Sequence, residues 1–282
     1  MARCWQLRSR SLPLDGGPQV MGILNVTPDS FSDGGKHRAV VAAVEAALQM
    51  EDAGAAIIDI GGESTRPYSD PVATAEELQR VVPVLEQLQG RLAVPVSIDT
   101  SKAAVARAAL DLGAEIINDV SGLERDPEMG ALAAARQAGV CVMHMQGTPQ
   151  TMQDAPAYEN VVEEIDAYLQ QRAAACLALG IAPERICLDP GIGFGKTHAH
   201  NLALLRGVGR FLELPYPLLI GHSRKGFIAH VLDDRTVDRD AGTLGVSLAM
   251  AAAGVDFLRV HDVPATVQAL RLFRACREAS PR

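Results

Sequence analysis

The segment VPVSIDTSKAAVARAALDLGAEIINDV, Val94 to Val120, contains one complete unit of a pattern that recurs along the chain. An apolar run ends in Asp99, and an alanine-rich segment follows in which apolar residues stand three and four positions apart. That spacing is typical of an amphipathic helix, and Gly113 stands where helices commonly end. A second apolar run then begins. The segment therefore predicts a strand, a helix and a second strand.

The same order of elements occurs throughout the sequence. The apolar runs are VMGILNV (20–26), AAIIDIGG (55–62), VPVSIDT (94–100), AEIINDV (114–120), VCVMHM (140–145), RICLDPG (185–191), PLLIGHS (217–223) and DFLRVHD (256–262). Eight such units, with strands apolar on both faces, are typical of a parallel barrel. A doubly wound open sheet is the alternative, because alternation alone does not prove closure. We predict a single α/β domain, a TIM (β/α)8 barrel over residues 19–282, after an N-terminal extension or short hairpin at residues 1–18.

Length and composition exclude several classes of protein. The 282 residues fit one barrel, and a net charge of -8 argues against a nucleic-acid partner. Five cysteines without a CxxC pair suit a reducing cytoplasm. The N-terminus has no apolar signal region, and eighteen uncharged apolar residues never occur together. We expect a cytoplasmic protein without a membrane partner.

Each apolar run ends near a polar side chain. These are Asn25, Asp59, Asp99, Asn118, His144, Asp189, Ser223 and His261. Singly, such residues are more often caps or turn formers: Asp59 and Asp119 could cap the following segments, and Asn118 could form an Asx turn. In a parallel barrel, however, strand ends meet at one rim, where burying so many unpaired polar groups without a ligand would be costly. The set therefore indicates a site.

The residue types suggest what this site could bind. Buried Asp and Asn side chains suit a flat heterocycle with an amidine or guanidine edge, as in a pterin. Arg66, Arg259 and His261 suit an anion, for which phosphate is the best candidate. Oxygen atoms near Asn25 could hold Mg²⁺, which usually combines few protein ligands with substrate phosphates and water. The GIGFGK segment, 191–196, lacks the Walker spacing and is interpreted as a glycine-shaped barrel loop.

Long motifs in these positions resemble the dihydropteroate synthase family, whose members join a dihydropterin diphosphate to p-aminobenzoate in folate biosynthesis. The matching stretches are GILNVTPDSFSDGG, IDIGGESTRP, VSIDTSK, INDVSG, MHMQGTPQTMQ, LDPGIGFGK, SRK and RVHDV. They extend in family order from about residue 20 to about residue 265. The resemblance implies the family's barrel, its magnesium ion and its homodimer.

The resemblance also implies a role for individual residues. The pterin pocket would consist of Asp99, Asn118, Met143, Asp189 and Lys225. The diphosphate would bind Asn25, Thr65, Arg66, Arg259 and His261, and the metal would bind Asn25 and Asp33. The p-aminobenzoate pocket would consist of Phe31, Thr65, Pro67, Phe194 and Ser223. The catalytic set would be Asp99, Asp33, Lys225, Arg259 and His261.

The segment from Thr27 to Gly35 is predicted to be a lid that brings Phe31 and Asp33 over bound substrates. His222, where the family carries apolar residues, should face away from the pocket by strand alternation. Phe31 and Phe194 have no insertion beside them of the kind found in sulfonamide-tolerant relatives, so sensitivity to sulfonamides is expected. Two other hypotheses are a methyltransferase that uses a reduced folate and a catalytically silent pterin-binding homologue. Arg66 and the SRK and RVHD motifs argue against the methyltransferase. The silent homologue is disfavoured by a set of intact residues: Phe31, Asp33, Arg66, Lys225, Arg259 and His261.

Overall fold

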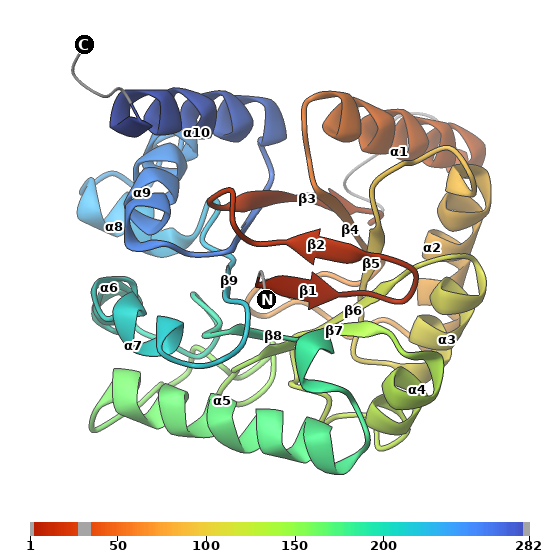
Figure 1. Cartoon of the computed structure of the whole chain (residues 1–282), viewed down its shortest axis with the longest axis horizontal. Coiled ribbons are helices and arrows are strands. Elements are labelled where there is room, and N and C mark those ends of the chain that lie inside the picture. The colour runs from red at the N-terminus through yellow and green to blue at the C-terminus, as the bar shows by residue number, and fades with distance from the viewer. Residues whose placement is uncertain (1–2, 28–34, 279–282) are drawn as a thin grey trace.

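Eight parallel strands form a closed barrel at the centre of the molecule (Figure 1). The computed structural model describes residues 3–27 and 35–278. The barrel strands are β3 (Gln19–Asn25), β4 (Ile57–Gly61), β5 (Val96–Asp99), β6 (Ile116–Asp119), β7 (Gly139–Met143), β8 (Ile186–Asp189), β9 (Leu219–Ile220) and β10 (Phe257–Val260). Leu188 closes the ring through a parallel bridge to Leu218, and its N–H donates to the Pro217 oxygen at 2.9 Å. The predicted barrel is confirmed, and the open sheet is excluded.

Helices cover the outside of the barrel (Figure 1). They are α1 (Gly35–Asp52), α2 (Thr74–Leu88), α3 (Ala103–Asp111), α4 (Met129–Arg136), α5 (Val161–Ala178), α6 (His198–Arg206), α7 (Val208–Leu212), α8 (Gly226–Val231), α9 (Asp240–Ala253) and α10 (Val263–Glu278). α1 and α3 end just before Gly54 and Gly113, whose φ angles are +98° and +101°. Within the described residues, no helix is long and apolar enough to cross a bilayer.

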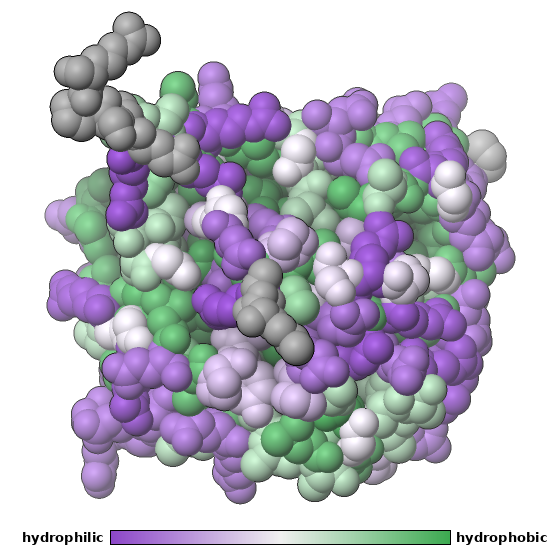
Figure 2. Space-filling view, in the orientation of Figure 1, coloured by the Kyte–Doolittle hydropathy of each residue, from purple (hydrophilic) through white to green (hydrophobic). Residues whose placement is uncertain are grey.

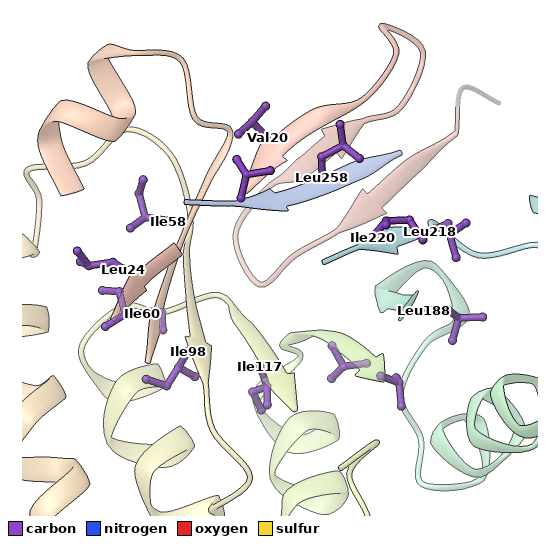
Figure 3. Packing of buried hydrophobic residues seen from close by; sticks show 14 of the residues in the cluster. Val20, Leu24, Ile58, Ile60, Ile98, Ile117, Leu188, Leu218, Ile220 and Leu258 are labelled. Atoms are coloured by element: carbon purple, nitrogen blue, oxygen red, sulfur yellow. The ribbon is translucent and has the colours of Figure 1, made fainter. Parts of the chain in front are cut away.

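Strand alternation separates two apolar layers. Outward side chains such as Val20, Ile58, Ile98, Ile117 and Leu258 pack between the strands and the helices (Figure 3). Burial of one such side chain stabilises the fold by roughly 1.5–3 kcal/mol. Inward side chains form the second layer, inside one end of the barrel: Met21, Ile57, Ile116, Cys141, Cys187, Leu219 and Phe257. This end of the barrel is therefore a packed core rather than a channel.

An antiparallel hairpin closes the same end of the barrel. Its strands are β1 (Cys4–Gln6) and β2 (Ser11–Pro13), which cross the barrel in Figure 1. Trp5 is fully buried with its ring centroid 5.1 Å from that of Phe257, and Arg10 pairs with Glu115 at 2.8 Å. Polar residues predominate on this face of the molecule (Figure 2). The opposite end, where the strands terminate, carries the polar strand-end residues and is the end at which a barrel of this kind binds its ligand.

Candidate active site

The carboxyl ends of β5 to β8 bring four predicted pterin-binding residues together. Asp99, Asn118, Met143 and Asp189 are each less than 9% exposed. Asp99 pairs in register with Asn118, and Met143 with Asp189. Parallel strands therefore hold their side chains at similar depths in the barrel mouth, where a flat polar molecule could contact them together.

Arg259 of β10 joins two carboxylates in this mouth. Its Nε donates to Oδ2 of Asp59 at 2.6 Å, and its Nη2 donates to Oδ2 of Asp99 at 2.6 Å. Asn118 also donates to Oδ2 of Asp59, at 3.0 Å. Asp59 is fully buried, and its other oxygen, Oδ1, has no partner within the described part of the chain. Asp59 is thus the innermost charged group of the site.

For two strand-end residues, this geometry excludes the alternative that they are only local caps or turns. Asp59 does not cap the segment after β4, and Asn118 forms a cross-strand contact instead of an Asx turn. Asp119, by contrast, accepts the N–H groups of Ser121 at 2.8 Å and Leu123 at 3.2 Å. Only the last of these three side chains organises its own loop.

Burial raises the affinity of the mouth carboxylates for protons. It raises the pKa of Asp99 to about 7, and Arg259 opposes the rise. It raises the pKa of Asp189 to about 6, against a hydrogen bond from the Gly191 N–H at 2.7 Å. Burial acts to lower the pKa of Arg259, but Asp59 and Asp99 outweigh it and raise that pKa. Near neutral pH, Asp99 can thus exchange a proton while Arg259 stays charged.

Lys225 connects these carboxylates with Phe194. Its Nζ lies 4.1 Å from the centroid of the Phe194 ring, a cation–π contact. Burial, followed by the charge of Arg259, lowers the pKa of Lys225 to about 8, while Asp189 and Asp99 act in the opposite direction. A residue from the predicted pterin pocket and one from the predicted p-aminobenzoate pocket therefore touch.

The loop after β8 has the glycine-shaped form that its sequence predicts. Gly191 has a φ of +69°, and a Cβ there would lie only 1.9 Å from the main-chain oxygen of His144. The same loop is fastened by Lys196, whose Nζ donates to the Phe194 oxygen at 2.8 Å and lies 3.0 Å from Nδ1 of His144. Lys196 is 2% exposed, so Phe194 is held from within the protein.

Four cations act electrostatically on His261, which lies just after β10. Burial first, and then the charges of Arg224, Arg259, Lys225 and Arg66, lower the pKa of His261 to about 4. The ring is therefore neutral at neutral pH, and Nδ1 lies 2.9 Å from the Ser223 hydroxyl. A neutral ring among cations favours an anionic ligand, because an anion would relieve the repulsion between them.

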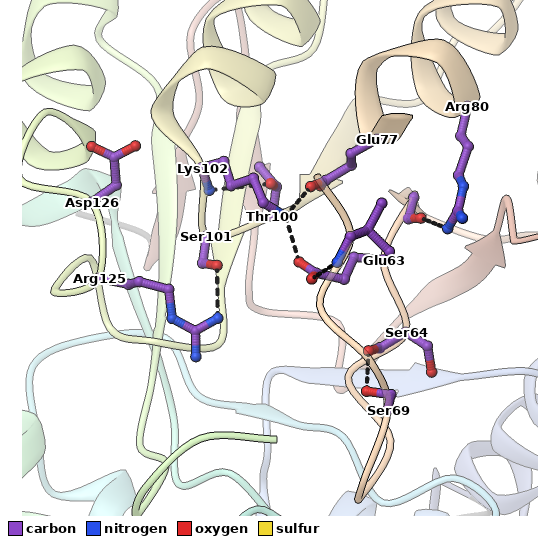
Figure 4. A network of polar contacts seen from close by, with 12 residues as sticks. Glu63, Ser64, Ser69, Glu77, Arg80, Thr100, Ser101, Lys102, Arg125 and Asp126 are labelled. Carbon is purple, nitrogen blue, oxygen red and sulfur yellow. Dashed lines mark hydrogen bonds and ion pairs between the residues drawn. The ribbon is translucent and has the colours of Figure 1, made fainter. Parts of the chain in front are cut away.

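The β4–α2 loop carries Thr65, Arg66 and Pro67 to the rim. A polar network fixes its first part (Figure 4): Lys102 bonds Glu63 at 2.7 Å and also pairs with Glu77, and Arg80 donates to the Gly62 oxygen at 2.7 Å. Thr65 and Asp99 line the same small hollow at the mouth. Thr65 therefore lies beside the pterin-binding candidates, while Arg66 is more exposed.

The structure describes some of the remaining predicted residues and not others. Asn25 ends β3, half-buried and in register with Gly61. Phe31 and Asp33, and with them most of the predicted lid, lie outside the described residues. Within the described ranges no group of three or more His, Cys, Asp or Glu is placed to hold a metal ion. His222 faces α9, as predicted, with Nε2 2.8 Å from the Ser247 hydroxyl.

Three polar residues of the site were given no role from the sequence: Asp59, Arg224 and Lys196. Asp59 stands two positions after inward-facing Ile57, so alternation places it inside the barrel, but its partner is 200 residues away. Arg224 lies within SRK and pairs with Asp240 at 2.6 Å, which the motif alone does not indicate. Lys196 is the last residue of GIGFGK, and lysine is rarely fully buried.

Comparison with known proteins agrees with this geometry. The family model described as "Pterin binding enzyme" matches residues 21–261. The dihydropteroate synthase of Escherichia coli K12 is 49% identical over 264 residues, which cover 93% of each chain. The crystal structure of the Yersinia pestis synthase with a sulfonamide drug complex matches with a TM-score of 0.91 and 44% identity, covering 98% of this chain and 100% of that one.

The synthase of Xanthomonas albilineans, solved with 4-aminobenzoic acid, matches with a TM-score of 0.92 and 44% identity over the whole of both chains. Similarity at this level extends over the barrel, the mouth and the hairpin alike. The resemblance found in the sequence motifs is thereby confirmed. The chain belongs to the pterin-binding enzyme family, and within it to the dihydropteroate synthases.

Proposed function

We infer that the chain condenses 6-hydroxymethyl-7,8-dihydropterin diphosphate with p-aminobenzoate, giving 7,8-dihydropteroate and diphosphate in folate biosynthesis. The observation that carries this inference is the meeting of two groups at one barrel mouth. Asp99, Asn118 and Asp189 supply the polar pocket. Arg259, one of the cations that act on His261, contacts Asp99 directly. A substrate with a pterin at one end and a diphosphate at the other matches both.

We assign the pterin to the pocket of Asp99, Asn118, Met143, Asp189 and Lys225. The carboxylates would accept hydrogen bonds from the guanidine-like edge of the ring, and the Asn118 amide can both donate and accept. Met143 and Val120, buried with Phe194 in a small apolar cluster, would contact the flat face of the ring. Lys225 would donate to a ring acceptor while it stays over Phe194.

The diphosphate is assigned to Thr65, Arg66, Arg259 and His261, with Asn25 at the end of β3. His261 would donate from Nε2, since its Nδ1 lies against the Ser223 hydroxyl. The oxygens of Asn25 and, outside the described residues, Asp33 suit Mg²⁺, which would complete its shell with diphosphate oxygens and water. Such an ion would neutralise charge on the leaving group.

The p-aminobenzoate pocket is assigned to Thr65, Pro67, Phe194 and Ser223, with Phe31 from the lid segment outside the described residues. Phe194 offers an aromatic face to the benzoate ring, and the Thr65 hydroxyl can donate to its carboxylate. Ser223, whose hydroxyl proton goes to Nδ1 of His261, would line the pocket. The pocket would thus lie between the β4–α2 loop and the loops after β8 and β9. A sulfonamide has a similar shape, so we expect it to compete for this pocket.

The proposed mechanism follows from the separation of positive and negative charge at the mouth of the barrel. The bond between the pterin methylene and its ester oxygen breaks, and the diphosphate keeps the electron pair. Arg66, Arg259 and His261 would stabilise the departing anion, while Asp99 and Asp33 offset the cation left on the pterin. The amine of p-aminobenzoate then forms the new C–N bond and loses one proton. Closure of the lid segment would keep water away from the cation.

We further propose a cytoplasmic homodimer. All five cysteines are free, which suits a reducing compartment. Apolar residues gather over α8 and α9 at the left of Figure 2, where Val231 and Leu232 are 58% and 50% exposed. An exposed apolar patch of this kind favours association with a second copy. Sedimentation analysis should give twice the monomer mass, and V231E/L232E should shift it to the monomer.

A turnover assay tests the proposed activity directly. With both substrates and Mg²⁺ present, diphosphate release should be coupled to formation of dihydropteroate, and each should require p-aminobenzoate. Asp99→Asn should abolish turnover by weakening pterin binding. Pterin binding without any diphosphate release in the unmodified protein would favour a silent binding homologue instead.

A further inference from the structure

The carboxylate of Asp99 is paired with the guanidinium of Arg259. The contact joins Nη2 of Arg259 to Oδ2 of Asp99 at 2.6 Å. The same guanidinium also bonds Asp59 through Nε at 2.6 Å. A pterin that approaches Oδ2 of Asp99 must therefore compete with Arg259 for this oxygen.

The two carboxylates differ in their surroundings. Asp59 is 0% exposed, and Asn118 as well as Arg259 donates to its Oδ2. Its Oδ1 is buried without a partner among the described residues, so Arg259 supplies the positive charge that balances it. Asp99 is 8% exposed, ends its strand and lines the hollow at the mouth. Only Asp99 can be reached from outside, and separating Asp59 from Arg259 would leave a buried carboxylate unbalanced.

We propose that Asp59 is a positioning residue that holds Arg259 permanently, while Asp99 is an exchangeable partner that Arg259 releases when a pterin binds. Asp59 keeps Nε in place, and the freed Nη2 becomes available to the diphosphate. One arginine would thereby link occupation of the pterin pocket to completion of the anion site. The inference rests on the proposed pterin-binding role of Asp99.

The variant Asp59→Asn separates this role from simple structural support. Its amide keeps the shape but removes the charge, so Arg259 would retain Asp99 as its single anionic partner. Release of Asp99 then becomes more costly for a ligand that offers no anion in return. We expect 6-hydroxymethylpterin to bind at least about tenfold more weakly, which corresponds to about 1.4 kcal/mol. The dihydropterin diphosphate should lose less, because its diphosphate replaces Asp99 beside Arg259.

Binding is measured by calorimetry at pH 8.0, where Asp99 is largely ionised. Glu115→Gln is the matched control, because Glu115 is a buried carboxylate paired with an arginine at 2.8 Å at the opposite end of the barrel. It should change neither affinity. If Asp59→Asn lowers the affinity for both ligands equally, or lowers neither, the proposed exchange of Asp99 is wrong. Asp99→Asn should weaken both ligands, and if it weakens neither, the proposed pterin site itself is misplaced.

A structure of the unmodified protein with 6-hydroxymethylpterin decides the question even if Asp59→Asn does not fold. The contact between Arg259 Nε and Asp59 should persist, and the contact between Arg259 Nη2 and Asp99 should be broken. A complex in which Arg259 keeps Asp99, or leaves Asp59, contradicts the proposal.

Discussion

The Nζ atom of Lys196 lies 3.0 Å from Nδ1 of His144, although both side chains are buried. Nζ also lies within hydrogen-bond distance of the main-chain oxygens of His144, at 3.3 Å, and Phe194, at 2.8 Å. Burial, followed by the charge of Lys196, lowers the pKa of His144 to about 3, so the ring is neutral and Nδ1 can accept. Lys196 thus ties the end of β7 to the loop that presents Phe194.

Lys196→Met should loosen that loop. It would leave the oxygens of His144 and Phe194 unpaired in the interior, and we expect the free energy of unfolding to fall by about 1–3 kcal/mol. Because Phe194 belongs to the proposed p-aminobenzoate pocket, the KM for p-aminobenzoate should rise several-fold while the KM for the pterin substrate changes little. Urea denaturation and steady-state kinetics measure the two effects. Equal increases in both KM values would contradict the assignment of Phe194 to the p-aminobenzoate pocket.

Binding of a bare pterin should depend on pH through Asp99. The ionised carboxylate accepts from the ring, and the pKa of Asp99 in the free protein is about 7. Affinity should therefore fall as pH drops through 7, by about tenfold per pH unit, and more steeply below about 6, where Asp189 is also protonated. Calorimetry near pH 7 in buffers of different ionisation enthalpy should show proton release on binding. Asp99→Asn should bind weakly and remove the fall in affinity around pH 7, leaving the fall below about pH 6 that belongs to Asp189. A fall that persists around pH 7 would identify a different titrating group.

Arg259→Ala should affect the two kinds of ligand unequally. Loss of the guanidinium removes a proposed diphosphate contact, so affinity for the dihydropterin diphosphate should fall far more than affinity for a bare pterin. It also leaves the buried carboxylate of Asp59 without its countercharge, which should lower the free energy of unfolding by about 3–5 kcal/mol. Adding Asp59→Asn to this variant should restore part of the stability without restoring diphosphate binding. Equal affinity losses for both ligands would show that Arg259 is misassigned.

Periodic features of the sequence predicted most of the fold. Apolar runs located the barrel strands, and helical spacing with a terminal glycine located α3. Strand alternation predicted that His222 faces away from the pocket, and the side chain lies against α9. These predictions succeed because each depends on residues close in sequence and on the layers that a parallel barrel imposes.

Pairing between distant residues could not be predicted in this way. The partners of Asp59 are Arg259 and Asn118, and the position of Asp59 at a strand end was equally compatible with a cap. Lys196 was treated as part of a loop, since nothing local indicates that His144 lies against it. Both misses concern buried polar groups, whose state is decided by tertiary contacts rather than by periodicity.

The β4–α2 loop should depend on one buried ion pair beneath it. Lys102 joins Glu63 at 2.7 Å and also pairs with Glu77, whose side chain is fully buried and whose Oε1 has no partner among residues 3–27 and 35–278 (Figure 4). Lys102→Met would leave the Glu77 carboxylate without its cation, so we expect a loss of about 3–5 kcal/mol in unfolding free energy. Release of Glu63 would also free the loop that carries Thr65 and Arg66, raising the KM of both substrates.

The double variant Lys102→Met/Glu77→Leu separates these two effects. Removing both buried charges should recover most of the stability, because an apolar pair can replace a buried ion pair at little cost. The KM values should stay high, because Glu63 would still lack its ion pair with Lys102, which leaves the loop with only the contact between Glu63 and the Val72 N–H. Thermal unfolding and steady-state kinetics on the two single variants and the double variant complete the cycle. Recovery of both stability and KM would show that Lys102 supports the fold alone and has no part in positioning Thr65 and Arg66.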